Sequence, residues 1–249
     1  AACEAARVRI GAGVYLWLTL YPRNDRMRYP VLFLLTCLFV TICASDAARA
    51  GPWPRLPGQV FLSTTSSFSA EGSFLRSESY LEYGLNPRLT LGASFEVTSY
   101  VSQYEGFLRW HPETLGTFLP EGTAMGVTAG LRYRPYSLAP WQPFLGAEIG
   151  RGFELLGGNA WAQAGGRVFA AQAPWGMEYA LDLGAQAGLR RGRWLGMLGL
   201  THFQTQLNSI TRLRPAIGVE IGRFTLVGEA VIPPSGRLEA LRIGLWQEF

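Results

Sequence analysis

The chain has 249 residues, of which 48% are hydrophobic and 16% are charged, and its formal net charge is +4. This length suits one large domain or two small ones. The sequence contains no lysine and no basic run, which excludes the composition that is typical of nucleic-acid-binding proteins.

The first fifty residues have the layout of an export signal. An apolar run at residues 29–44 follows a short basic start at Met27-Arg28 and precedes the cleavage pattern Ala48-Arg49-Ala50. The run is shorter than the roughly 18 residues of a spanning helix. We therefore predict a signal peptide at residues 27–50, cleaved near Ala50/Gly51, and interpret residues 1–26 as an upstream non-native extension.

Residues 51–249 form the predicted folded part. All three cysteines precede Gly51, so this part has no disulfide and no thiolate metal site. It carries 16 arginines and 15 acids, so its net charge is close to zero. We expect no cofactor and no bound metal.

From Gly58 onward, apolar residues recur at a spacing of two between short turn signals, which is typical of β-strands. The stretch Leu89–Val97 alternates almost without a break. The pattern predicts twelve strands, with ten also possible: 58–68, 73–85, 89–101, 104–110, 123–133, 143–153, 160–172, 177–190, 194–206, 212–221, 224–231 and 237–249. A tilted membrane-spanning strand takes about 9 to 11 residues. We predict an all-β, antiparallel up-and-down transmembrane β-barrel.

The alternation alone also fits a soluble sandwich, and three further features favour a membrane barrel instead. Nearly every segment has a long apolar face, and no segment resembles a polar edge strand. Lysine, which commonly protects exposed edges, is absent. Aromatic residues gather near segment ends, as in the girdles of outer-membrane barrels: Tyr83, Trp110, Tyr133, Trp161, Trp175 and Trp194.

The C-terminal segment, with Leu241, Ile243, Leu245 and a final Phe249, resembles the targeting strand of Gram-negative outer-membrane barrels. This resemblance implies outer-membrane localisation, with lipid, lipopolysaccharide and the barrel-assembly machinery as partners. Gln247 departs from the pattern. The phrase "SYLEYGLNPRLTLGASFE" resembles a strand–turn–strand unit of an outer-membrane family assigned to phenol degradation (the MetA pathway). That resemblance implies a barrel for hydrophobic compounds and no particular functional residue.

We expect function to lie on the inward face, where arginines and acids are nearly balanced. A narrow channel for small solutes is the first hypothesis, and a structural barrel closed by Arg–carboxylate pairs is the alternative. In the predicted topology, Arg132, Arg134, Arg212 and Arg214 lie toward the outer mouth, where they could attract anions. The candidate lumen-lining residues are Glu82, Glu96, Arg109, Arg132, Arg134, Glu148, Arg190, Arg212, Arg214 and Glu220.

An enzymatic function has weaker support. His111 and His202 are the two histidines, and neither lies in a hydrolase motif such as G-x-S-x-G. A lipid-modifying barrel that uses His202 stays open as a third hypothesis. The predicted outer connections are short and the longest connection, residues 111–122, is periplasmic, which argues mildly against adhesion. The sequence does not indicate an oligomeric state.

Overall fold

The computed structural model describes residues 7–10, 14–17, 52–98, 102–112 and 119–249. Two units separate within the chain, at residues 1–43 and 44–249. In the first unit, β1 (Arg7–Ile10) and β2 (Val14–Trp17) pair as a two-stranded antiparallel sheet. The predicted signal peptide lies wholly outside the described residues, and its cleavage stays a prediction. No helix in the described part is long and apolar enough to cross a membrane.

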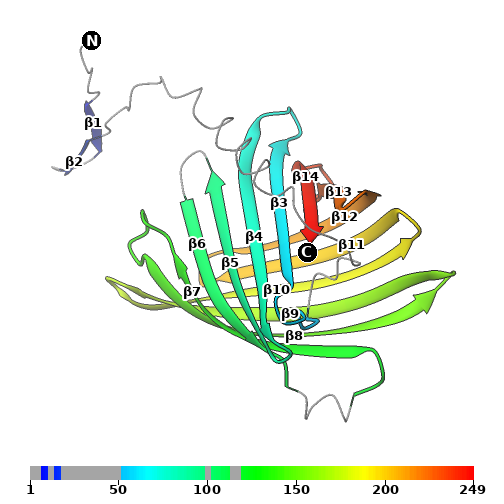
Figure 1. Ribbon diagram of the computed structural model, residues 1–249. Coiled ribbons are helices and arrows are strands. Elements are labelled where there is room, and N and C mark those ends of the chain that lie inside the picture. The colour runs from blue at the N-terminus through cyan, green and yellow to red at the C-terminus, as the bar shows by residue number, and fades with distance from the viewer. Residues whose placement is uncertain (1–6, 11–13, 18–51, 99–101, 113–118) are drawn as a thin grey trace. The chain divides into compact units, whose positions relative to one another are not determined.

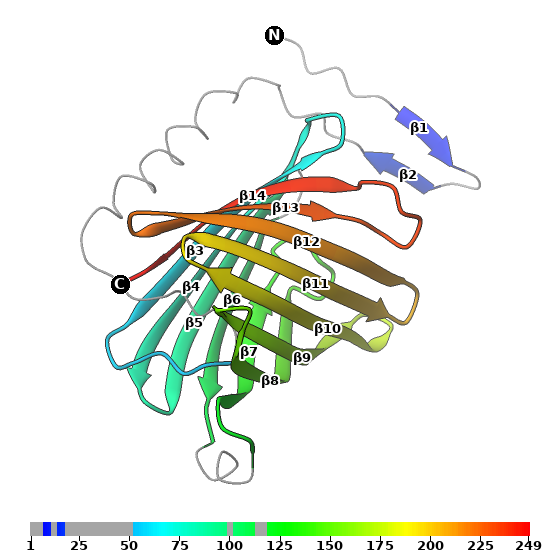
Figure 2. The same ribbon diagram turned by 90° about the vertical axis from the view of Figure 1, so that its right-hand side faces the viewer.

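In the second unit, twelve antiparallel strands close into a barrel in chain order, with β14 pairing to β3 (Figures 1 and 2). This confirms the predicted barrel and strand number. The strands are β3 (Val60–Ser69), β4 (Phe74–Asn86), β5 (Leu89–Thr98), β6 (Ser102–Trp110), β7 (Thr123–Tyr133), β8 (Trp141–Leu155), β9 (Gly158–Ala173), β10 (Gly176–Arg191), β11 (Trp194–Thr205), β12 (Ser209–Ile221), β13 (Phe224–Val231) and β14 (Ala240–Glu248).

The two ends of the barrel differ. The rim that carries residues 52–59 and Phe249, which we call the terminal rim, also has two-residue turns at 87–88, 156–157, 192–193 and 222–223. The opposite rim, which we call the distal rim, carries the connections at 70–73, 134–140, 174–175, 206–208 and 232–239. The terminal turn at Leu156-Gly157 has positive φ at both residues, 52° and 70°, as a two-residue hairpin turn of type I′ requires.

Burial along the strands is inverted relative to a soluble protein. On β5 and β6 the exposed residues are apolar, such as Leu91 (46%), Phe95 (39%) and Leu108 (48%). Their sequence neighbours Thr90 and Arg109, which point inward, are 0% and 6% exposed. The exposed apolar face continues around the barrel, so the outer wall suits hydrocarbon and the polar side chains face the lumen.

Aromatic residues form part of the predicted outer girdle. Phe95, Tyr104, Tyr133 and Trp141 make a ladder across four strands at the distal rim, with neighbouring ring centroids 4.9, 6.3 and 4.4 Å apart. Trp110, Trp175 and Trp194 are exposed as well. The interpretation of Trp161 as a girdle residue is wrong, because its side chain lies inside the barrel above Gly188.

Several strand boundaries also differ from the expected ones. The first strand begins at Val60, because Gly58 and Gln59 bond to the backbone of Gly84 as an incoming segment. β8 and β9 extend two residues further at the distal rim and the terminal rim, respectively, than their alternation indicates. The last strand begins at Ala240, because Arg237–Glu239 belong to the connection from β13.

Candidate functional site: the barrel lumen

A segment from Pro52 to Gln59, which we call the strap, enters the lumen at the terminal rim. Pro52 and Trp53 lie against the position where Gly150 of β8 would carry a Cβ. Arg55 is 2% exposed; its Nε donates to Glu82 of β4 at 2.6 Å and its Nη1 to Glu248 of β14 at 3.1 Å. Since β8 lies across the closed strand order from β3 and β14, the strap crosses the terminal opening.

The strap needs a glycine in the wall. A Cβ at Gly84 would lie 2.0 Å from the carbonyl oxygen of Leu56. The backbone of Gly84 bonds to both Gly58 and Gln59, at 2.8 and 2.9 Å. The Gln59 amide also donates to Glu248 at 2.7 Å. Close backbone approach therefore fixes the strap in addition to the charges of Arg55.

Buried charges continue from Arg55 along the wall. Glu82 accepts from Arg55, Tyr80 and Arg109, and Arg109 also pairs with Glu148 of β8. The side chains of Arg55, Glu82 and Arg109 are at most 8% exposed. Opposite charges thus alternate around the terminal half of the lumen, which satisfies groups that would otherwise be costly to bury.

His111 lies beside this network, directly after β6. Its Nδ1 lies 3.2 Å from the carbonyl oxygen of Met125 and its Nε2 lies 3.3 Å from the Thr90 hydroxyl. The carbonyl can only accept, so Nδ1 carries the proton and Nε2 accepts from Thr90. Burial, and then the nearby charge of Arg109, lower the pKa of His111 below its usual value. The imidazole is therefore neutral near pH 7.

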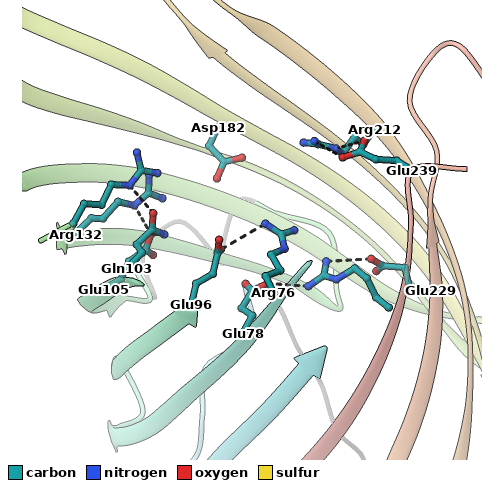
Figure 3. Close-up of polar contacts among 12 residues, drawn as sticks. Arg76, Glu78, Glu96, Gln103, Glu105, Arg132, Asp182, Arg212, Glu229 and Glu239 are labelled. Atoms are coloured by element: carbon teal, nitrogen blue, oxygen red, sulfur yellow. Dashed lines mark hydrogen bonds and ion pairs between the residues drawn. The ribbon is translucent and has the colours of Figure 1, made fainter. Parts of the chain in front are cut away.

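A second network lies in the distal half, on the β6–β10 side. Arg132 Nε donates to Glu105 at 2.6 Å, and its guanidinium carbon lies 3.7 Å from the centre of the Phe169 ring. Arg167 joins Glu105 to Asp182 at 3.0 and 2.7 Å. Arg134 Nε donates to the neutral amide of Gln103 at 2.7 Å. Figure 3 shows Arg132 beside Glu105 and Gln103 at this wall.

The other side of the lumen, from β12 around to β5, carries a third set of pairs (Figure 3). Arg214 forms a bidentate pair with Glu229, which also accepts from Arg242 at 3.1 Å. Arg242 then pairs with Glu78 at 2.8 Å. Nearer the distal rim Arg76 pairs with Glu96 at 3.6 Å and Arg212 with Glu239 at 2.7 Å, and these side chains are 25–39% exposed.

All ten candidate residues face the lumen, but they do not form one site. Glu82, Arg109 and Glu148 belong to the terminal network. Arg132 and Arg134 stand together on the distal side, as Arg212 and Arg214 do on the other wall. Arg190 and Glu220 pair at 2.7 Å in the terminal half of β10 and β12. Glu96 pairs with Arg76.

The sequence analysis missed an aromatic core within the lumen. Phe107, Phe144 and Phe169 form a buried cluster, and Tyr80 stacks on Phe107 with centroids 5.9 Å apart. The signal was present, because Phe107, Phe144 and Phe169 share strand parity with Arg109, Glu148 and Arg167. Arg55 had no such signal, since it lies before the first strand.

Inward glycines make room for these rings. A Cβ at Gly92 would lie 2.0 Å from the Phe107 ring, one at Gly130 2.4 Å from Phe144, and one at Gly188 2.2 Å from Trp161. Each glycine is directly opposite its ring in the strand register. Inward glycines therefore do more than reduce bulk, because they let neighbouring rings lie against the wall.

Space remains beside this core. A cavity of about 490 Å³ is lined by every barrel strand except β5, and it includes Tyr80, Phe107, Gly184 and Trp246. A smaller cavity of about 240 Å³ lies near Arg132, Arg134, Phe169 and Phe203 toward the distal rim. No group of three His, Cys, Asp or Glu side chains within the described ranges is placed to hold a metal ion.

His202, the residue of the enzymatic hypothesis, lies outside the lumen. It shares the outward face of β11 with Leu198 and Leu200, and its Nδ1 is 2.8 Å from the hydroxyl of Thr211 on β12. His202 therefore lies on the outer side of the barrel wall and does not line the lumen.

Comparison with known proteins bears on the fold. No protein-family model and no curated protein sequence matches the chain. Among solved structures, the KdgM porin superposes with a TM-score of 0.56 at 8% identity, over 76% of this chain and 99% of that one. A KdgM porin in complex with disordered oligogalacturonate gives 0.54 at 7% identity, over 77% and 99%. An outer membrane channel from Pseudomonas putida F1 gives 0.44 at 11%, over 82% and 100%.

The two superpositions on the KdgM porin show that the chain has the fold of a porin-type β-barrel. At such low identity they transfer no residue and no solute. What the lumen does must be argued from its own side chains.

Proposed function

We propose that the protein is a passive outer-membrane channel for small solutes. The observation that carries the proposal is the 490 Å³ cavity, which lies inside a closed barrel and is lined by polar as well as apolar residues. The exposed apolar outer wall supports placement in a bilayer. The fold likeness to porins supports the same class of function.

The expected orientation places the terminal rim in the periplasm. Outer-membrane barrels have short periplasmic turns, and four of the turns at the terminal rim have two residues. Phe249 exchanges backbone hydrogen bonds with Val60 at this rim. We also propose that the assembly machinery recognises this last strand and that the barrel contacts lipopolysaccharide.

The channel should discriminate weakly by charge. Within the part of the chain that the structure describes, every lumen arginine on the candidate list except Arg134 has a carboxylate partner within 4 Å. Paired charges of opposite sign create little net field along a pore. The early expectation of anion attraction by the distal arginines therefore has little support.

Recording from purified protein in planar bilayers tests the proposal. We expect discrete current steps above background and, in a salt gradient, a reversal potential near zero. A folded barrel that gives no steps would contradict channel function.

A structural barrel is the second candidate, and the strap favours it, because Pro52–Gln59 crosses the terminal opening. It predicts no conductance in the whole protein. The two candidates separate when residues 52–57 are deleted: a closed barrel starts to conduct, whereas a channel only conducts more.

Two finer interpretations remain predictions. Membership of the phenol-degradation family would make hydrophobic compounds the solutes. A lipid-modifying activity would use His202, and unchanged membrane lipids in a His202→Ala strain would contradict it.

A further inference from the structure

The 490 Å³ cavity lies between two unlike walls. On one wall, Tyr80 of β4 stacks on Phe107, and Phe61 packs edge-on at 6.2 Å. The other wall belongs to β9–β11, and β10 lies opposite β4 in the closed strand order. Gly184 stands in the middle of β10, directly between Gly165 of β9 and Thr201 of β11. The cavity is therefore a slot between a wall of aromatic rings and a wall that has glycine at its middle.

Packing does not explain Gly184. Gly92, Gly130 and Gly188 each lie beneath a neighbouring aromatic ring, whereas a Cβ at Gly184 would meet nothing within 4 Å. Its φ lies outside the positive range that favours glycine. A side chain here would fit the backbone and would project into the cavity. The missing side chain thus keeps the slot open.

The charges that line the slot cancel. Four arginines and four acids contribute: Arg109, Arg167, Arg214 and Arg242 with Glu78, Glu148, Asp182 and Glu229. They are joined by ion pairs that include Arg167–Asp182 at 2.7 Å and Arg214–Glu229 at 2.9 Å. A charged solute would find no free counter-charge there and would lose its hydration.

Neutral hydrogen-bonding groups complete the lining. They are Ser63, Thr65, Thr128, Gln163, Gln186 and Thr201. Hydroxyl and amide groups both donate and accept hydrogen bonds, so they suit a solute with many hydroxyls. A purely apolar solute would leave them unpaired, which costs free energy.

We propose that this slot binds an uncharged, ring-shaped polyol, namely a neutral sugar of one or two rings. The C–H face of a sugar ring packs on Tyr80, and its hydroxyls meet the neutral side chains and the ion pairs. The volume of about 490 Å³ falls within the roughly 300–1,000 Å³ of small-molecule sites. The inference deepens the proposed channel function, on which it rests for solute access.

Binding is measured on the full-length folded barrel in detergent, by isothermal titration with maltose, galacturonate and phenol. We expect saturable binding of maltose and at least tenfold weaker binding of the other two. Absence of maltose binding, or tighter binding of galacturonate or phenol, overturns the proposal without the use of any variant.

A matched pair of variants then locates the site. Gly184→Leu should reduce maltose affinity at least tenfold, because leucine fills the slot. Gly228→Leu is the control: this glycine also has nothing within 4 Å of its Cβ position, but it faces outward on β13. Unchanged binding in Gly184→Leu, with normal heat-resistant mobility of the folded protein, overturns the placement.

Bilayer recordings with the same solutes separate the two proposals. Maltose binding without any conductance contradicts the channel and leaves the sugar site. Conductance without maltose binding or maltose block contradicts the sugar site and leaves the channel.

Discussion

The two rims of the lumen use the same chemistry at different burial. At the terminal rim, Arg55, Glu82 and Glu248 are at most 5% exposed, and the strap that carries Arg55 crosses the opening. At the distal rim, Arg76, Arg212 and Glu239 are 33–39% exposed. An ion pair in water contributes little to stability, whereas removal of one partner of a buried pair is costly. The ion pairs at the terminal rim therefore contribute more to stability than those at the distal rim, which is the more solvated end.

Replacement of Arg55 should have the largest effect, because it breaks the terminal half where the strap is anchored. Arg55→Ala leaves Glu82 and Glu248 buried with one cationic partner fewer, and we expect a loss of about 3 kcal/mol in the free energy of unfolding. The released strap should also raise the single-channel conductance. Urea unfolding in lipid vesicles and bilayer recording measure the two effects.

The matched control is Arg223→Ala, since Arg223 is exposed in a turn of the same rim. It should change neither quantity. Equal stability of the Arg55 and Arg223 variants would contradict the structural role of the strap.

Arg132 and Arg214 extend the comparison to the distal half. Arg132 is 6% exposed and lies on the Phe169 ring, whereas Arg214 is 30% exposed and its partner Glu229 keeps Arg242. We expect Arg132→Ala to cost about 2–3 kcal/mol and Arg214→Ala less than about 1 kcal/mol, again by urea unfolding. Similar losses in the free energy of unfolding of the two variants would show that burial does not determine how much each ion pair contributes to stability.

These contrasts show what could not be predicted from the sequence. Alternation placed all ten candidate charges inward because strand parity is a local property. How deeply a side chain is buried is not a local property. Arg132 and Arg214 have the same strand parity and the same kind of sequence neighbours. Only the ring of Phe169 and the exposure of β12 distinguish them. The strap could not be predicted, because Pro52–Gln59 has no strand period and its contacts lie up to 193 residues away in the chain.

The glycines test the aromatic core between the two halves. Gly92→Ala would force a Cβ against the Phe107 ring, and overpacking of this kind costs about 1–3 kcal/mol. Gly106→Ala is the control, because Gly106 faces outward on the adjacent strand with nothing within 4 Å of its Cβ position. Urea unfolding of the two variants should differ by at least about 1 kcal/mol; equal values would contradict the packing of the ring on glycine.

His111 offers a pH test of the terminal half. Its folded-state pKa is lowered by burial, so the unfolded chain binds a proton at a higher pH, near about 6.5. Stability from the neutral imidazole is complete above that value and is lost as the pH falls through the folded-state pKa. We expect the midpoint of urea unfolding to drop more between pH 7 and pH 5 in the native protein than in His111→Gln. Parallel pH profiles would show that His111 is not held neutral.

Arg212 should give the smallest effect, because it is the most solvated test of the distal half. Glu239 is 39% exposed, and the hydrogen bonds from Arg212 lower its pKa below the usual value. The stability that this pair contributes is complete above about pH 4.3, the pKa of glutamate in the unfolded chain, and is lost as the pH falls below it. Since exposed pairs are screened, Arg212→Ala should cost less than about 1 kcal/mol at low salt and nothing measurable at 1 M salt. A loss that persists at high salt would mean that the distal connection depends on this pair as the strap depends on Arg55.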